Sequence, residues 1–333
     1  MSKPEMTAQQ PKKGAAKSFF KRSNTELSIF LLIVLLFVLF SFFTKNFFSW
    51  YNIHNLFKQS VVIGIISIAL SFVFVTGRTD LSVGTTAGLS AMIVALLMSK
   101  LGMNPWLAII IAVGLSTLCG LFNGIIIYDL KVVPFIATMG TSGVVRGLIK
   151  YMSNAMTIGN LDPGFNQFAL TKFLGVSSLI YFWFVIVAIA FFVMKFTKFG
   201  RNLYVLGSSD EVANLSGINT RRHVYMAYII SAFLSAVAGI LMTSRLNCAV
   251  PTGGTGFEMN AIASAVIGGV SMSGATGTPF GAALGTFLIM LIQNGGIQLG
   301  IDPFIMESVS GLMVIVAVCF NGFRERSAAK VKS

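Results

Sequence analysis

Few side chains in this sequence are placed to do chemistry. The acids near or within its apolar segments are Asp80, Asp129, Glu258, Asp302 and Glu307. No nucleophile and base stand at a spacing typical of covalent catalysis, and the cysteines and histidines are too scattered for a disulfide or a metal site. A G-x-x-x-x-G-K-[ST] loop is missing, so this route to ATP binding is missing too. The pattern therefore predicts no catalytic site, and no metal or cofactor bound by this chain.

A second group of residues is suited to interrupting a helix inside a membrane. Asp80, followed by Leu-Ser-Val-Gly, can cap the next helix, although a proton relay is the alternative for an acid held between helices. The glycine-rich run at 268–285 favours either close helix packing or a broken helix that lines a path. The candidates for a path or a helix break are Asp80, Ser82, Gly84, Asn123, Thr138, Gly268, Gly269, Ser271 and Gly274.

The composition indicates what kind of elements must hold these residues. Of the 333 residues, 55% are hydrophobic and only 11% are charged, and the mean hydropathy is +0.82. Soluble domains contain about 25% charged residues. The length would suit two soluble domains, but serial apolar runs favour a single membrane domain. The sequence therefore predicts an all-α integral membrane protein.

Ten apolar runs are long enough, or nearly long enough, to be membrane helices. We expect them near residues 27–43, 57–76, 82–99, 105–128, 134–152, 177–194, 223–243, 258–271, 279–297 and 304–321. The eighth run is short and rich in glycine, so it is expected to be a broken or partly buried helix. The first run is not followed by a small-residue cleavage site, and we expect it to be an uncleaved anchor.

The basic residues predict the orientation of these helices. The net charge is +13, and with the N-terminus inside, 17 of the 24 Lys and Arg residues fall on the cytoplasmic side. This placement at the ends of the spans fits membrane topology better than nucleic-acid binding. We expect a basic cytoplasmic tail at 1–22, a membrane domain at 23–323 with a cytoplasmic segment at 200–222, and a cytoplasmic tail at 324–333.

The 200–222 segment, GRNLYVLGSSDEVANLSGINTRR, is polar although membrane-like sequence flanks it on both sides. Its SSDE run predicts a capping box in which Ser208 is the N-cap and Glu211 reaches back to it. Gly217 is expected to be a left-handed C-cap, which leaves a helix of about two turns that is marginal without support. Two interpretations stay open: an ordinary loop resting on the membrane domain, and a helix that docks on a cytoplasmic partner.

This segment resembles the cytoplasmic coupling segment of bacterial ABC importer permeases of the ribose, galactose, xylose and autoinducer-2 group. That family's pattern is Gly-Arg, then Tyr-Ala-Ile-Gly-Gly-Asn, two variable residues, Ala-Ala, one variable residue and Leu-Ser-Gly-Ile. The residues in register here are Gly200, Arg201, Tyr204, Gly207, Ala213, Leu215, Ser216, Gly217 and Ile218. The chain departs from the pattern at Ser208, Ser209 and Val212.

Four further patches resemble the family in the same order, so the resemblance covers most of the chain. They are GRTDLSVG at 77–84, NGIII at 123–127, VPFIATMGTSGVVRG at 133–147 and NAIASAVIGGVSMSGATGT at 260–278. Within the last patch, Asn260 stands where the family usually has Asp, and GATG replaces a Gly-Gly-x-Gly.

The resemblance implies the membrane domain of a type II ABC importer, which moves a monosaccharide such as ribose and is not an enzyme. The residues it implies for coupling to the ATPase are Gly200, Arg201, Tyr204, Gly207, Ser208, Asp210, Glu211, Ala213, Leu215, Ser216, Gly217 and Ile218. An ABC permease for nucleosides or branched-chain amino acids is the first alternative. An ion-coupled secondary transporter and a membrane enzyme are disfavoured by the scarcity of buried acids and of catalytic groups.

The resemblance also implies partners and a location. ATP and Mg²⁺ would be bound by a separate ATPase subunit with tandem nucleotide-binding domains. A periplasmic or lipid-anchored sugar-binding protein would be received by the outer loops at 153–176 and 244–257. A second permease copy or a paralogue would complete the path, and the bacterial inner membrane would hold the assembly with both termini in the cytoplasm.

Overall fold

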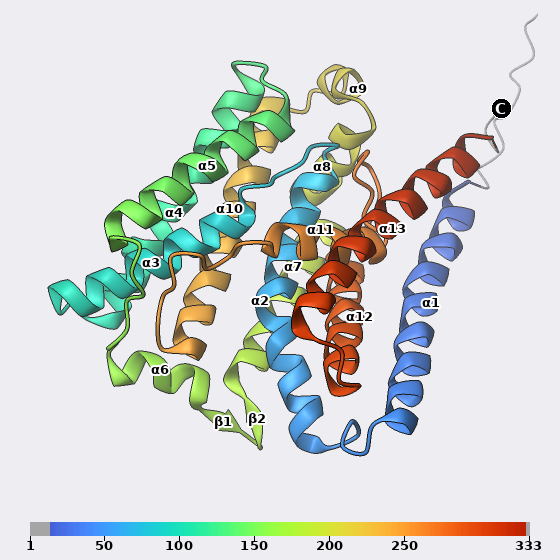
Figure 1. The fold of residues 1–333 in the computed structure, drawn as a ribbon. Helices are drawn as coiled ribbons and strands as arrows, with labels where there is room; N and C mark the ends of the chain where they lie inside the picture. The colour runs from blue at the N-terminus through green and yellow to red at the C-terminus, as the bar shows by residue number, and fades with distance from the viewer. Residues whose placement is uncertain (1–13, 331–333) are drawn as a thin grey trace, which may run out of the picture.

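The computed structural model describes residues 14–330, which fold as a bundle of helices (Figure 1). Residues 1–13 and 331–333 lie outside the described residues, and they include most of the predicted N-terminal tail and the last part of the predicted C-terminal tail. The rest of both predicted tails continues the first and last helices.

The long helices are α1 (Gly14–Phe43), α2 (Trp50–Phe74), α3 (Val83–Leu101), α4 (Pro105–Tyr128), α5 (Pro134–Ser153), α7 (Ser178–Phe196), α10 (Thr220–Leu246), α12 (Pro279–Gln298) and α13 (Pro303–Lys330). The shorter elements are α6 (Pro163–Leu170), α8 (Lys198–Ser208), α9 (Asp210–Leu215), α11 (Phe257–Ile267), and the hairpin of β1 (Lys172–Phe173) with β2 (Val176–Ser177). In Figure 1, α9 lies at the top of the bundle and α6 with the hairpin at the bottom. We call these the α9 end and the α6 end.

Each of the ten predicted runs overlaps a helix, which confirms an all-α membrane protein. Within the described residues, seven helices are long and apolar enough to cross a membrane, namely α1, α2, α3, α4, α7, α10 and α12. The eighth predicted run corresponds to α11, which has only 11 residues. The count of ten spans therefore stays a prediction.

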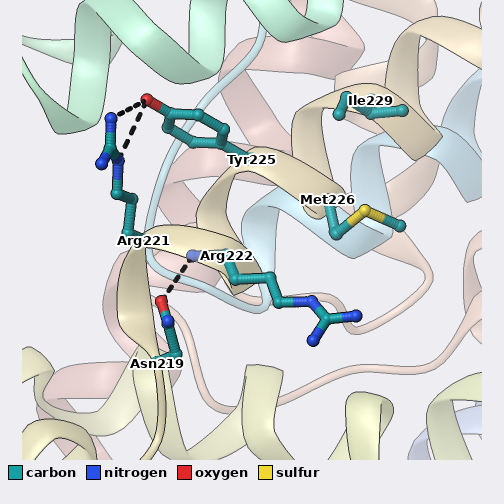
Figure 2. Close-up of a pocket in the computed structure, with 6 residues that line it drawn as sticks. All are labelled: Asn219, Arg221, Arg222, Tyr225, Met226 and Ile229. Carbon is teal, nitrogen blue, oxygen red and sulfur yellow. Dashed lines mark hydrogen bonds between the residues drawn. The ribbon is translucent and has the colours of Figure 1, made fainter.

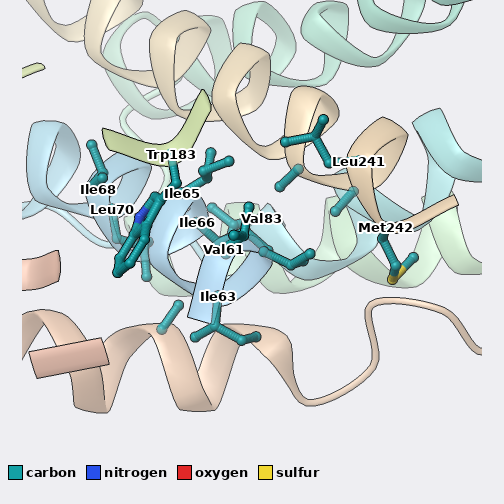
Figure 3. Close-up of a cluster of buried hydrophobic side chains, with 14 of the residues drawn as sticks. Val61, Ile63, Ile65, Ile66, Ile68, Leu70, Val83, Trp183, Leu241 and Met242 are labelled. Carbon is teal, nitrogen blue, oxygen red and sulfur yellow. The ribbon is translucent and has the colours of Figure 1, made fainter. Parts of the chain in front are cut away.

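α2 lies inside the bundle and is buried along most of its length. Every side chain from Ser60 to Phe74 is buried, and the helix packs against α7, α10, α11 and α12. Figure 3 shows its isoleucines among Trp183 of α7 and Leu241 of α10. Gly64 permits the contact with α7, because a Cβ there would lie 2.5 Å from Nε1 of Trp183. From Ser60 onward α2 is apolar nearly all round, which suits a position surrounded by protein.

Glycines let α10 approach its neighbours closely. A Cβ on Gly120 of α4 would lie 2.3 Å from the carbonyl oxygen of Tyr228, and a Cβ on Gly239 of α10 would lie 2.0 Å from that of Ala87. Small residues at helix contacts are typical of membrane proteins, where van der Waals packing replaces the hydrophobic effect. These contacts join α3, α4 and α10.

The two segments predicted as outer loops lie together at the α6 end. Ile158 and Ala249 exchange two backbone hydrogen bonds, of 2.9 and 2.8 Å. The hydroxyl of Ser244 donates to a backbone carbonyl in α6 at 2.8 Å. The segments around α6 and after α10 therefore form one joined surface.

Candidate functional site

The 200–222 segment folds as two short helices with a break at Ser209. The predicted N-cap at Ser208 is wrong by one residue, because the hydroxyl that accepts from the N–H of Val212 belongs to Ser209, at 3.3 Å. Ser208 is instead the last residue of α8. Two adjacent serines carry the same local signal, and α8 remains helical through the first of them.

The C-terminal end of α8 is wedged between two loops. A Cβ on Gly207 would lie 1.8 Å from the carbonyl oxygen of Val75 and 2.7 Å from the nitrogen of Ala275. The N–H of Ala275 donates to the same Val75 carbonyl at 2.9 Å. One turn earlier, the hydroxyl of Tyr204 donates to the carbonyl of Gly277 at 2.7 Å. The end of α8 is thus joined to both the α2–α3 loop and the α11–α12 loop.

Few contacts hold α9 on the bundle. Ala213 is fully buried, in a small cluster that includes Leu206 of α8 and Tyr228 of α10. Asp210, in the first turn of α9, pairs with Arg78 of the α2–α3 loop at 2.8 Å. Because the Asp210 side chain is 55% exposed, this ion pair contributes little by itself. α9 therefore rests lightly on the rest of the chain.

The opposite side of α9 is open. Val212 and Leu215 of α9 are 51% and 83% exposed. Glu211, which precedes Val212 in the same helix, is exposed too. Gly217 has a φ of +73°, which confirms the predicted left-handed conformation, and nothing lies within 4 Å of a Cβ placed there. Within the described residues, Val212 and Leu215 therefore form an uncovered apolar pair on an otherwise polar segment.

The other residues predicted for coupling in this segment form hydrogen bonds at the ends of α8 and α9. The N–H of Gly200 donates to the N-cap hydroxyl of α8 at 3.1 Å, and Arg201 donates to a carbonyl at the end of α7 at 3.1 Å. The hydroxyl of Ser208 donates to a carbonyl of α8 at 2.6 Å, and that of Ser216 to a carbonyl of α9 at 2.8 Å. The N–H of Ile218 donates back to α9 at 3.0 Å.

A buried carboxylate organises the loop between α2 and α3. Asp80 is 1% exposed. Its Oδ1 accepts from the N–H and the hydroxyl of Ser82 at 2.9 and 2.6 Å, and its Oδ2 from the hydroxyl of Ser231 on α10 at 2.9 Å. Burial raises the pKa of the Asp80 carboxyl, while these hydrogen bonds oppose the shift. Ser82 is the N-cap of α3, so Asp80 orders the residue that precedes the helix rather than capping the helix itself.

The network around Asp80 reaches α4 and α5. Nδ2 of Asn123 donates to the hydroxyl of Ser82 at 2.9 Å, and the hydroxyl of Thr141 donates to Oδ1 of Asn123 at 2.6 Å. The N–H of Leu81 donates to the hydroxyl of Thr138 at 3.1 Å. Four of the nine candidates for a path or a helix break therefore meet in one buried network that joins α3, α4, α5 and α10.

The beginnings of α3 and α11 meet at Gly84. A Cβ there would lie 2.4 Å from the carbonyl oxygen of Gly254 and 2.3 Å from Oε2 of Glu258. That Oε2 atom is buried, and it has no hydrogen-bond partner among the described residues. Arg146 of α5 donates to the hydroxyl of Thr255 in the same loop. Polar groups of α5 and α11 thus gather where two helices begin, an arrangement that broken helices of transporters use for binding.

The last four candidates lie in the loop after α11, beginning with its C-cap Gly268. Gly268 contacts α12 backbone to backbone, because a Cβ there would lie 2.2 Å from the carbonyl oxygen of Gly281. Gly269 and Gly274 have φ values of +90° and +97°, and the N–H of Ser271 donates to a carbonyl across the same loop at 3.1 Å. Close packing accounts for the first glycine, and tight turns account for the other two.

A hollow of about 330 Å³ lies at the start of α10, beside the 200–222 segment (Figure 2). At its edge Arg221 donates to Asp129 at 2.8 Å and to the hydroxyl of Tyr225 at 3.3 Å. The hydrogen bond from Tyr225 and the bond from Arg221 lower the pKa of Asp129. Asp129, one of the acids near the apolar segments, is therefore part of a surface ion pair.

Three of these partners were not identified from the sequence. Ser231 donates a hydrogen bond to Asp80, which is 151 residues away in the sequence, and no local sequence pattern predicts such a pair. Thr141 and Arg78 do lie in or beside patches that resemble the importer family. Resemblance alone did not indicate what they bind.

Within the described residues, seven helices long and apolar enough to cross a membrane define a multi-pass membrane protein. The family model for the permease component of branched-chain amino acid transport systems matches residues 52–318. The chain therefore belongs to this permease family.

Individual relatives agree over nearly the whole length. The ribose import permease protein of Bacillus subtilis is 35% identical over 91% of this chain and 94% of its own. The galactose/methyl galactoside import permease protein of Salmonella typhimurium is 31% identical over 90% and 94%. The autoinducer 2 import system permease protein of Salmonella choleraesuis is 30% identical over 91% and 87%.

Membership in this family has direct consequences. The chain is a transport subunit of the ABC importer class rather than an enzyme, and it lies in the inner membrane. Permeases of this class act with an ATPase and a substrate-binding protein. Within residues 14–330, no group of three or more His, Cys, Asp or Glu side chains is placed to hold a metal ion.

Proposed function

We propose that this chain forms the translocation path of an ATP-driven importer for a monosaccharide. The observation that carries the proposal is the similarity to ribose and galactose import permeases over about nine-tenths of the chain. Branched-chain amino acids are the second candidate, because the matched family model is described by them. Nucleoside transport and an ion-coupled mechanism have less support, because none of the relatives described above is named for either.

We propose that α9 is the helix on which the ATPase acts. Its exposed Val212 and Leu215 would contact the ATPase, while Gly207 fixes the adjoining α8 to two loops of the bundle. One of these loops leads to Asp80 and hence to α4, α5 and α10. A movement of α9 would therefore reach the α2–α3 loop through the backbone contacts at Gly207. It would reach α4, α5 and α10 through the buried side chains that bond to and around Asp80.

We place the path beside the junction of α3, α5 and α11. Polar and charged groups inside a membrane domain are costly and mark functional sites, and this junction holds Arg146, Thr255 and the unpaired Oε2 of Glu258. The satisfied network of Asp80, by contrast, is assigned to holding the break between α2 and α3. A second permease copy or a paralogue would face this junction across the path.

For the orientation, we propose that the α9 end is cytoplasmic and the α6 end is outside. The ATPase, with its tandem nucleotide-binding domains, would bind the first end. The binding protein would bind the joined loops at the second end. The excess of Lys and Arg on the proposed cytoplasmic side supports this orientation.

Uptake into proteoliposomes tests the function. The permease with its ATPase and binding protein should take up a neutral monosaccharide when ATP is supplied, and an uncoupler should leave uptake unchanged. The permease alone should hydrolyse no ATP. Uptake of leucine but not of sugar would show that the substrate is a branched-chain amino acid. Uptake that requires a proton gradient would refute the ATP-driven importer mechanism.

Cysteine labelling tests the orientation. In a background in which Cys119, Cys248 and Cys319 are replaced by alanine, Leu215→Cys should react with an impermeant reagent only from the cytoplasmic side. Gln167→Cys, on the exposed surface of α6, should react only from outside. Labelling of Leu215→Cys from outside would exclude contact between α9 and a cytoplasmic ATPase.

A further inference from the structure

A polar cavity opens at the α6 end of the bundle, between the beginning of α2 and the end of α12. Its volume is about 600 Å³, within the range of about 300–1,000 Å³ for small-molecule sites. Six carboxamide side chains line it: Asn46, Asn52, Asn55, Gln59, Asn294 and Gln298. Carboxamides inside a membrane helix are costly unless they are hydrogen-bonded, so their number here requires an explanation.

Part of this set is satisfied by the protein itself. Nδ2 of Asn52 donates to the carbonyl of Phe47 at 3.0 Å, and Nε2 of Gln298 donates to Oδ1 of Asn52 at 2.6 Å. These bonds tie the end of α12 to the beginning of α2. They fix the walls of the cavity.

Three other lining amides, of Asn55, Gln59 and Asn294, are little used by the described residues. Asn294 is 7% exposed, and the only hydrogen bond of its side chain among the described residues is a long one that Oδ1 accepts from Nε2 of Gln298, at 3.5 Å. The half-buried amides of Asn55 and Gln59 have no hydrogen-bond partner among the described residues. Because Asn55 and Gln59 are four residues apart on α2, they lie on the same side of the helix. Three amides on two helices are therefore available to a ligand.

The chemistry of the lining selects the kind of ligand. Among the described residues, the lining contains no carboxylate, and the exposed Lys45 is its one charged residue. Each free carboxamide offers both a donor and an acceptor, and a hydroxyl group needs both. We propose that this cavity binds a neutral polyhydroxylated molecule of monosaccharide size at the outer mouth of the permease. The choice of a sugar rests on the proposed function, whereas the preference for hydroxyl groups rests on the lining alone.

The position of the cavity suits a molecule that arrives from the binding protein. Nε2 of His54, in the first turns of α2, accepts from the N–H of Ser177 in the hairpin at 2.9 Å. The same stretch of α2 therefore borders the cavity and the α6 end, where the joined loops lie. A sugar released there would meet the amides before it meets the junction of α3, α5 and α11.

Saturation-transfer NMR on the whole permease in phosphatidylcholine nanodiscs tests the site directly, without the ATPase or the binding protein. D-ribose and D-galactose should give signals. The double variant Asn55→Leu/Gln59→Leu should bind about tenfold more weakly, since it loses two hydrogen-bonding groups. Leucine suits a membrane helix, so the variant should insert normally. Thr117→Leu, on α4 and outside the cavity, also replaces a polar side chain of a membrane helix by leucine. It is the control and should keep the signals.

The glycerol headgroup of phosphatidylglycerol carries the same vicinal hydroxyls, so nanodiscs containing that lipid form a second arm. Unchanged sugar signals there support the proposal, and signals abolished by the lipid would assign the cavity to a headgroup instead. Equal signals from the double variant and the wild type would also overturn the proposal. In the complete importer, the double variant should take up sugar several-fold more slowly with ATP. A wild-type importer that takes up no sugar would refute the proposed function, a result distinct from the NMR outcome.

Discussion

Gly207 and Gly217 lie in the same polar segment, and the structure gives them opposite surroundings. At Gly207 there is no room, because an added Cβ would lie 1.8 Å from a backbone oxygen. At Gly217 there is ample room, but the backbone has a φ of +73°. The first glycine is required by packing and the second by conformation. The comparison separates the part of the segment that is anchored to the bundle from the part that is offered to a partner.

The largest effect is expected from Gly207→Val. The side chain would collide with Val75 and Ala275, whose backbone atoms are fixed by their mutual hydrogen bond. Overpacking of this kind costs about 1–3 kcal/mol, and α8 would have to move away from both loops. We expect a lower midpoint of thermal unfolding in detergent and loss of ATP-driven uptake.

Gly114→Val is the control for that experiment. Gly114 is also a helical glycine, in α4, but none of the described residues lies within 4 Å of a Cβ placed there. It should unfold and transport nearly as the wild type does. If Gly207→Val were as stable and as active as this control, α8 would not be anchored at that point.

The role of one of these glycines can be predicted from the sequence, and the role of the other cannot. The left-handed position of Gly217 follows from local chain geometry, since Gly after a short helix is a frequent C-cap. The role of Gly207 depends on Val75 and Ala275, which approach it only in the folded bundle. The helices themselves were predictable because each apolar run has to span a fixed thickness. The hydrogen-bond network around Asp80 was not predictable, because it includes residues of α4, α5 and α10.

The same limit applies to the amide cavity at the α6 end. Asn52, Asn55 and Gln59 follow helical spacing at the beginning of α2, and Asn294 and Gln298 do so at the end of α12. Only Gln59 and Asn294 lie within the predicted runs at 57–76 and 279–297. This periodicity was available in the sequence, but it does not indicate that the two polar faces meet. The misplaced N-cap at Ser208 has the opposite cause, because there the local signal itself was duplicated.

A smaller effect is expected from Gly217→Val. A β-branched residue at positive φ costs about 1–2 kcal/mol, but the strain is confined to the exposed end of α9. The thermal midpoint of the bundle should hardly change, while binding of the ATPase in a pull-down assay and uptake should both decrease. Gly217→Asn should retain both, because Asn tolerates the left-handed conformation. Normal transport by Gly217→Val would favour the interpretation of this segment as an ordinary loop.

Replacement of the two adjacent serines should have unequal and still smaller effects. Ser209→Ala removes the N-cap of α9 and should cost about 1 kcal/mol, which would appear as faster hydrogen exchange at the N–H of Val212. Ser208→Ala removes only a bond to a carbonyl within α8 and should leave that exchange rate unchanged. If Ser208→Ala accelerated this exchange and Ser209→Ala did not, Ser208 would be the N-cap, as the sequence predicted.

The smallest effect is expected at the ion pair between Arg78 and Asp210, and it measures how firmly α9 is attached. The Arg78 side chain is 13% exposed and that of Asp210 55%, so the pair should contribute about 0.2–1 kcal/mol. Arg78→Gln and Asp210→Asn should each leave the thermal midpoint almost unchanged. The two changes combined should cost less than the sum of the single changes, because either one alone already removes the interaction. If Arg78→Gln alone abolished uptake without weakening ATPase binding, the loop of Asp80 would receive the movement of α9 through this pair rather than through the contact at Gly207.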